Sequence, residues 1–196
     1  GNLGTDPDNN FLGTIDDEPI RFRQNNVWMG EFDNSNGNYS IGLNAGSNLA
    51  PTGINNIALG SSALLNANTG YNNIAIGETS IQSITSGYKN IGIGKSTLFN
   101  NDTGSYNIAI GDSALFNNLI SRNIAIGNSA LLTNSNGANN IAIGNRSLES
   151  NTSGNDNTAI GTSAMINMTT GRENTSVGFQ AMRGAVAGSN SYYNTA

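Results

Sequence analysis

Large aliphatic residues recur along the chain in short alternating groups rather than in long runs. The stretch NNIAIG at residues 72–77 places two isoleucines around one alanine and ends in glycine, and close relatives of it occur eight more times. Side chains alternate between the two faces of a strand, so this period of two predicts a short strand with unlike faces. The group is too short and too β-branched for a helix.

The glycine that closes each group sets a period of 17 residues, with steps of 18, 17, 17, 17, 16, 17, 17 and 17. These motif glycines are Gly42, Gly60, Gly77, Gly94, Gly111, Gly127, Gly144, Gly161 and Gly178. A second glycine follows ten or eleven residues later, at Gly53, Gly70, Gly87, Gly104, Gly137, Gly154, Gly171 and Gly188, whereas one copy has Ser121 there. We expect both glycines to adopt positive φ at two turns.

Three further positions keep the same phase. The residue two before the motif glycine is always alanine, serine or glycine, and the residue four before it is always asparagine. A second apolar residue stands four after it, as Leu64, Ile81, Leu98, Leu115, Leu131, Leu148, Met165 and Met182. This column predicts a second strand-like stretch in each coil.

One coil cannot bury its aliphatic face alone, so we expect an all-β parallel β-solenoid of about nine stacked coils. Pro7, Pro19 and Pro51 precede the established repeats, as a continuous backbone ladder requires. Identical amides one strand apart can donate and accept along the stack and cap the turn before the strand. The predicted asparagine ladder comprises Asn56, Asn73, Asn90, Asn107, Asn123, Asn140, Asn157 and Asn174.

The small residue between the two isoleucines leaves two arrangements open. In the first, which we favour, isoleucine fills the coil interior and the small face meets another copy of the chain in a threefold assembly. In the second, alanine or glycine fills a thin interior and isoleucine lines the subunit seam. Both arrangements cover both faces of the strand.

The chain divides into three segments: residues 1–37, residues 38–188 with the repeats, and a tail at 189–196. The first segment holds seven acids and two arginines, and the remainder holds six acids and six bases. Its apolar residues predict short strands that cap the first coil or form a trimer junction. They are Phe11, Ile15, Ile20, Phe22, Val27, Trp28 and Met29.

The composition excludes several kinds of chemistry. Cysteine and histidine are absent, so thiolate metal sites, disulfides and a histidine base are excluded. The formal charge of −5 and the lack of a basic stripe exclude phosphate-driven nucleic-acid binding. No apolar run is long enough to cross a bilayer, so we expect no membrane insertion.

No catalytic constellation or cofactor motif emerges, and we interpret the chain as a non-enzyme. Asp16, Asp17 and Glu18 suggest a solvated turn more than a cation site, and Asp6, Asp8 and Asn10 imitate a calcium loop but lack its glycine. The stretch GIGKST at 92–97 is in phase with the other repeats and is a chance match to a phosphate loop. Tyr71 with Tyr88, and Phe99 with Phe116, are one period apart and predict aromatic stacks that are candidate glycan contacts.

The repeated Asn-x-x-Ala-Ile-Gly motif resembles the YadA-type head repeat of trimeric autotransporter adhesins. The segment DPDNNFLGTIDDEPIRFRQNNVWMGEFD also resembles regions that precede such repeats in bacterial surface and phage tail-fibre-like proteins, often of Bacteroidota type. The resemblance implies a left-handed parallel β-roll in a homotrimer. That family's repeat is near 14 residues, so the longer repeat here implies a longer second stretch or a wider turn.

The resemblance further implies an extracellular fibre or adhesin head, on a bacterial surface or a phage-like particle, that binds a cell-surface glycan or protein receptor. Two other functions remain open. An ice-binding solenoid requires a regular exposed column of threonine or alanine, and a polysaccharide-cleaving fibre requires carboxylates paired across chains.

Overall fold

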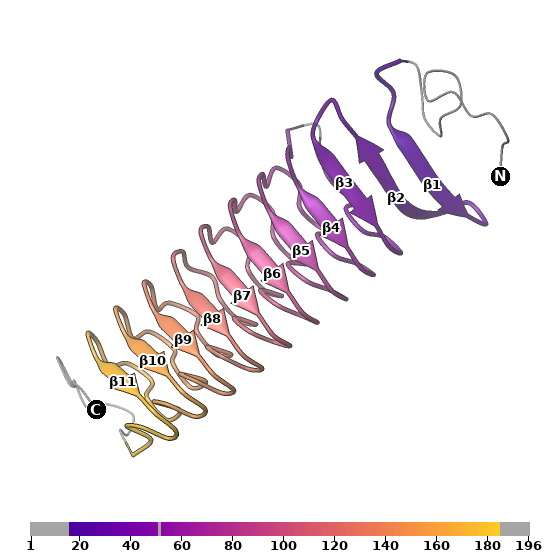
Figure 1. Cartoon of the computed structure of the whole chain (residues 1–196). Coiled ribbons are helices and arrows are strands. Elements are labelled where there is room, and N and C mark those ends of the chain that lie inside the picture. The colour runs from indigo at the N-terminus through magenta and orange to yellow at the C-terminus, as the bar shows by residue number, and fades with distance from the viewer. Residues whose placement is uncertain (1–15, 51, 185–196) are drawn as a thin grey trace, which may run out of the picture.

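The computed structural model describes residues 16–50 and 52–184, which form one eleven-stranded sheet (Figure 1). No helix occurs among these residues. The strands follow one another in the sheet in chain order, so each coil lies directly on the preceding one. Their bounds are β1 Ile20–Gln24, β2 Val27–Asp33, β3 Asn38–Ile41, β4 Ile57–Leu59, β5 Ile74–Ile76, β6 Ile91–Ile93, β7 Ile108–Ile110, β8 Ile124–Ile126, β9 Ile141–Ile143, β10 Thr158–Ile160 and β11 Thr175–Val177.

Strands β3 to β11 are parallel and in register, with Ile57 opposite Ile74 and Ile74 opposite Ile91. The backbone ladder continues outside the strands. The Gly77 amide donates to the Leu59 carbonyl at 2.8 Å, and the Ile81 amide donates to the Thr97 carbonyl at 2.8 Å. The predicted parallel β-solenoid is therefore confirmed. Its nine parallel strands are joined by eight full turns of chain, so it has eight complete coils rather than the nine expected.

The second apolar residue of each coil lies in a turn, so the prediction of a second strand is wrong. Leu64, Ile81 and Leu98 have φ of 49°, 48° and 48°, in the left-handed region that L-residues rarely enter. Each of these side chains is nonetheless fully buried. Burial and the ladder hydrogen bonds to the next coil offset the strain, and the chain can then turn sharply around a buried side chain.

The two glycine columns act differently. Gly77 has a φ of 132°, and a Cβ there would lie 2.4 Å from the carbonyl oxygen of Gly94 in the next coil. Gly87 does not adopt positive φ, so the expectation for the second glycine is wrong. Its role is steric, because a Cβ on Gly87 would lie 2.4 Å from the carbonyl oxygen of Gly104.

The small residue of each strand faces the interior, and the arrangement with isoleucine inside is wrong. Ala75 and Ala109 are fully buried, whereas Ile76 and Ile93 on the other face are 36% and 37% exposed. The reason is space, because the second apolar column and the asparagines fill the same interior. Only a methyl group or a small hydroxyl remains possible opposite them.

Packing around Gly92 is adjusted between the strand and the turns that face it. Gly92 replaces the usual alanine, and a Cβ there would lie 2.7 Å from the hydroxyl oxygens of both Ser80 and Thr97 and 2.8 Å from Cγ1 of Ile81. The two hydroxyls contact each other at 2.7 Å, and Ser80 also donates to the Gly92 carbonyl at 3.0 Å. The hydroxyl residues Ser80 and Thr97 thus take the space that the methyl group of an alanine at residue 92 would need.

An antiparallel hairpin extends the sheet at its N-terminal end. Strands β1 and β2 pair with each other, and β2 pairs with β3. Trp28 donates its indole N–H to the Ala45 carbonyl at 2.8 Å, which joins the hairpin to the first coil. Phe11, Ile15 and the tail at 189–196 lie outside the described residues. Val27 of this hairpin is 45% exposed.

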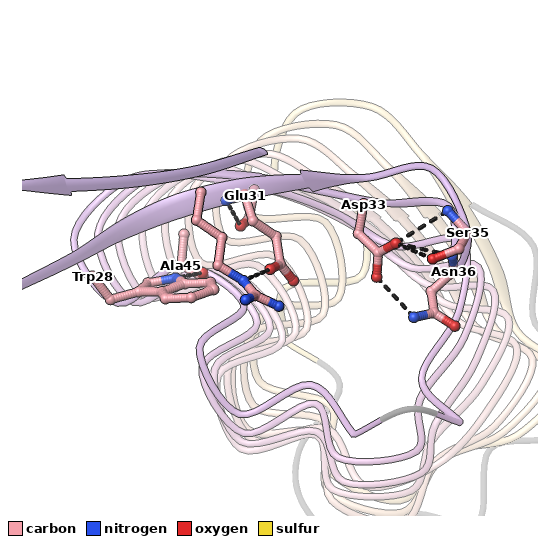
Figure 2. A network of polar contacts seen from close by, with 8 residues as sticks. Trp28, Glu31, Asp33, Ser35, Asn36 and Ala45 are labelled. Carbon is pink, nitrogen blue, oxygen red and sulfur yellow. Dashed lines mark hydrogen bonds and ion pairs between the residues drawn. The ribbon is translucent and has the colours of Figure 1, made fainter. Parts of the chain in front are cut away.

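Asp33 organises the turn that joins the hairpin to the solenoid (Figure 2). Its carboxylate accepts from the Ser35 hydroxyl at 2.6 Å, the Ser35 and Asn36 amides at 3.1 and 3.2 Å, and the Asn36 side-chain amide at 2.7 Å. Burial alone would raise the pKa of Asp33, but these hydrogen bonds outweigh it and lower the pKa below its usual value.

We expect Gly92→Ala to destabilise the fold by roughly 1–3 kcal/mol, because the added methyl overlaps two hydroxyls and Ile81. Chemical denaturation of Gly92→Ala, Thr97→Ala and the double variant measures the coupling. The double variant should be more stable than the sum of the single changes predicts, since Thr97→Ala vacates part of the space. Additive effects would contradict the proposed steric compensation.

We expect the Asp33 carboxylate to stabilise the fold at neutral pH and to lose that contribution in acid. Because its folded pKa is lowered, the stabilisation is present above the unfolded value near 3.8 and is lost as pH falls through the folded pKa. Thermal melting at pH 7 and pH 3 should show Asp33→Asn less stable than the wild type at pH 7, with a smaller difference at pH 3. An equal difference at both pH values would refute this assignment.

Candidate functional site

The asparagine that precedes each strand forms a continuous buried ladder. The Asn73 amide N–H donates to Oδ1 of Asn56 at 3.0 Å, and its Nδ2 donates to the same oxygen at 3.2 Å and to the Gly87 carbonyl at 2.9 Å. Oδ1 of Asn73 in turn accepts the corresponding pair of bonds from Asn90. The same two bonds to the preceding asparagine recur at Asn56, Asn90, Asn107, Asn140, Asn157 and Asn174.

Asn123 departs from this pattern. Its backbone N–H still donates to Oδ1 of Asn107 at 2.9 Å, but its Nδ2 donates to Oδ1 of Asn118 at 3.1 Å. The coil before it is the short one, and Ile120 rather than Ser121 occupies the place of the second glycine. The Ile120 carbonyl accepts from Nδ2 of Asn107 at 2.9 Å, as a glycine carbonyl does in the other coils.

A second asparagine ladder lies seven residues after the motif glycine. Nδ2 of Asn134 donates to Oδ1 of Asn118, and Nδ2 of Asn151 donates to Oδ1 of Asn134, both at 2.8 Å. Asn101 begins this column, and the equivalent residues in the coils before and after it are Ile84 and Met168, which are also buried. Sequence reasoning missed this ladder, although four successive copies carry asparagine at one phase.

Both predicted aromatic pairs are stacked. The Tyr71 and Tyr88 rings have centroids 4.7 Å apart and planes 5° apart, and the Phe99 and Phe116 rings have centroids 5.0 Å apart and planes 2° apart. Tyr106 lies beside Tyr88 with its ring turned by 73°, and the Lys89 ammonium lies 5.2 Å from the Tyr106 ring centroid. Tyr106 and Lys89 were not among the predicted contacts.

The outer face of strands β4 to β10 carries two aliphatic columns. The column directly before the motif glycine includes Leu59, Ile76, Ile93, Ile126 and Ile160, all between 36% and 37% exposed. The column two residues earlier is half-buried and runs as Ile57, Ile74, Ile91, Ile108, Ile124 and Ile141. We call these two columns the aliphatic face.

The acids at residues 16–18 lie at one cavity, and the lysine of the GKST stretch is ion-paired. Asp16, Asp17 and Glu18 line a cavity of about 340 Å³ together with Phe32 and Tyr39. Among the described residues, no group of three histidine, cysteine or carboxylate side chains could hold a metal ion. Lys95 of the GKST stretch forms an ion pair with Glu78 at 2.9 Å on the surface.

Comparisons with protein-family models, with curated proteins and with solved structures gave no match to this chain. The YadA-type resemblance therefore remains an expectation drawn from the repeated motif. A search of the described residues for a helix long and apolar enough to span a membrane found none.

We expect Asn90→Asp to destabilise the fold by about 3 kcal/mol or more at neutral pH, because a buried carboxylate would face Oδ1 of Asn73 and the Gly104 carbonyl without a proton to donate. Asn72→Asp is the matched control, since Asn72 is exposed and one coil earlier. Thermal melting should show a large loss only for Asn90→Asp. The loss should shrink at a pH low enough to protonate the carboxyl. Equal melting temperatures for both variants at pH 7 would show that the ladder amide contributes nothing.

Proposed function

We propose that the chain is the β-solenoid of a homotrimeric extracellular fibre or adhesin head that presents its outer surface to a cell-surface receptor. The observation that carries this proposal is the aliphatic face. Apolar residues normally avoid so regular an exposed array, and large exposed apolar patches favour an interaction surface.

The dimensions of the aliphatic face favour another copy of the chain as its partner. Six steps of roughly 4.8 Å between β4 and β10 give it a length near 30 Å, at a width of two side chains. Its side chains repeat once per coil along this whole length. Another copy has the same rise per coil, so the isoleucines of one copy meet those of the next at every level.

Identical partners most often assemble with closed symmetry, and the resemblance to trimeric adhesins favours threefold symmetry. Covering each exposed aliphatic side chain would stabilise the assembly by roughly 1 kcal/mol. Many small contributions of this kind, spread along the rod, hold a fibre together without any single dominant contact.

The remaining surface supports a binding role rather than a reaction. Its side chains vary from coil to coil at the turns, while the interior repeats. A rigid rod whose interior repeats from coil to coil and whose exterior varies suits presentation of a receptor-binding surface on a bacterial cell or a phage-like particle. The β1–β2 hairpin would serve as the cap, since it pairs with the otherwise open edge of β3.

Light scattering of the purified chain should give three times its mass of 20.3 kDa. The variant Ile76→Glu/Ile93→Glu places carboxylates within the aliphatic face, and it should run as a monomer because desolvating these charges opposes assembly. Ser86→Glu/Asn136→Glu adds the same charge at exposed turn positions and should remain trimeric. A monomeric wild-type chain, or an Ile76→Glu/Ile93→Glu variant that stays trimeric, would refute the proposed seam.

A further inference from the structure

The corner before strands β5 to β8 gathers aromatic and basic side chains from successive coils. Lys89, Tyr106 and Arg122 occupy the same position in three neighbouring coils, with φ of 55°, 60° and 67°. Their backbone amides donate to the carbonyls of Tyr71, Tyr88 and Ser105 in the preceding coil, at 3.0–3.1 Å. We call Tyr88, Lys89, Tyr106 and Arg122 the corner strip.

Tyr106 differs from the stacked rings beside it. Tyr71 and Tyr88 lie face to face one coil apart, so each covers a face of the other. The Tyr106 ring is turned by 73° relative to Tyr88 and its side chain is 43% exposed. The Lys89 ammonium lies over one face of the Tyr106 ring, 5.2 Å from its centroid, so a ligand ring would stack on the other face.

Ser105 explains why the Tyr106 ring lies outside the stack of Tyr71 and Tyr88. Ser105 stands where Tyr71 and Tyr88 stand in the earlier coils, and it is buried. Its hydroxyl accepts from the Tyr88 amide at 3.1 Å, and its own amide donates to the Ser121 hydroxyl at 3.0 Å. The tyrosine moves one residue further along the chain, and its ring leaves the stack.

Lys89 and Arg122 give the corner strip two positive charges. No carboxylate of the described residues forms an ion pair with Lys89 or Arg122, whereas Lys95 and Arg146 are paired with Glu78 and Glu149. Asp102, the acid nearest to Tyr106 in the sequence, accepts a hydrogen bond from the Thr85 hydroxyl. Hydrogen bonding to Tyr106 raises the pKa of Tyr88 above its ordinary value.

We propose that the corner strip binds an acidic saccharide chain, with one sugar ring stacked on Tyr106 and carboxylates or sulfates of the sugars on either side held by Lys89 and Arg122. The proposal deepens the receptor-binding role proposed above and rests on it only for its biological setting. Lys89 and Arg122 are two coils apart, or roughly 10 Å along the rod, so they can hold acidic groups on two different sugars of one chain.

A saccharide fits these features better than a nucleic acid does. Single-stranded nucleic acids are bound by basic grooves that follow many phosphates, with several stacked bases. The corner strip offers two cations and one open ring. Asp156 and Glu173 occupy the same position as Lys89 further along the rod, so the basic part of this column is short and suits a ligand with few acidic groups.

The test is a binding assay of the whole chain with polygalacturonate, dextran sulfate, uncharged dextran and a single-stranded oligothymidylate. The wild type should bind at least one of the two acidic polysaccharides and bind uncharged dextran weakly. The variant Lys89→Gln/Arg122→Gln should bind the acidic polysaccharide about tenfold more weakly, because two charge-assisted contacts are removed. Tyr106→Ser should weaken binding by roughly threefold to tenfold through loss of the ring platform.

The control variant Lys95→Gln/Arg172→Gln changes the net charge equally at two other places and should bind like the wild type. Light scattering and thermal melting of every variant show whether assembly and fold are kept. Equal weakening by both double variants, unchanged binding by Lys89→Gln/Arg122→Gln, or tighter binding to oligothymidylate would overturn the proposal. A wild-type monomer that still binds through these residues would instead refute the trimer and leave the corner strip supported.

Discussion

Hydrogen bonding from one coil to the next, along the axis of the rod, is the interaction on which this structure depends. A single coil is too thin to enclose an ordinary hydrophobic core, because its interior holds little beyond alanine, one larger apolar residue and asparagine. The Asn73 side chain, for example, joins three groups: its Oδ1 accepts from the backbone amide and the side-chain amide of Asn90, and its Nδ2 donates to the Gly87 carbonyl. Stability is then a property of neighbouring coils, as expected for solenoids.

The same closeness explains the strain that the coil contains. Coils one strand spacing apart leave no room for a Cβ at Gly77 or Gly87, and the turn around Ile81 requires a conformation that β-branched residues avoid. These costs are tolerated because the side chain of Ile81 is fully buried and its amide is paired with the next coil. The interior therefore permits few residue types, whereas the outer surface is free to vary.

Much of the fold could be predicted from the sequence because the repeat places equal residues in equal surroundings. The phase of Asn73, Ala75 and Gly77 was sufficient to predict a strand, a stack and a turn. The orientation of the strand could not be settled this way, since an alternation of isoleucine and alanine is compatible with either face inside. That choice depends on how much space Leu64 and its equivalents occupy, which is a property of the closed coil. The left-handed backbone of Leu64 and its equivalents could not be predicted either, because leucine in an apolar column predicts a strand by propensity.

A perfectly regular solenoid is limited in what it can bind at one place. The short coil of 16 residues is therefore informative. Identical coils offer the same surface at every level, so a ligand has no preferred place along a uniform rod. The coil between Gly111 and Gly127 breaks this equivalence by one residue. There Asn118 joins the two internal ladders by accepting from Asn123 and Asn134, which keeps the interior hydrogen-bonded across the deletion. The surface beside this coil can then differ from the surface of the other coils. Tyr106 and Arg122 lie on this part of the surface. An interior that absorbs a deletion in this way allows one coil to acquire a distinct surface without loss of the stack.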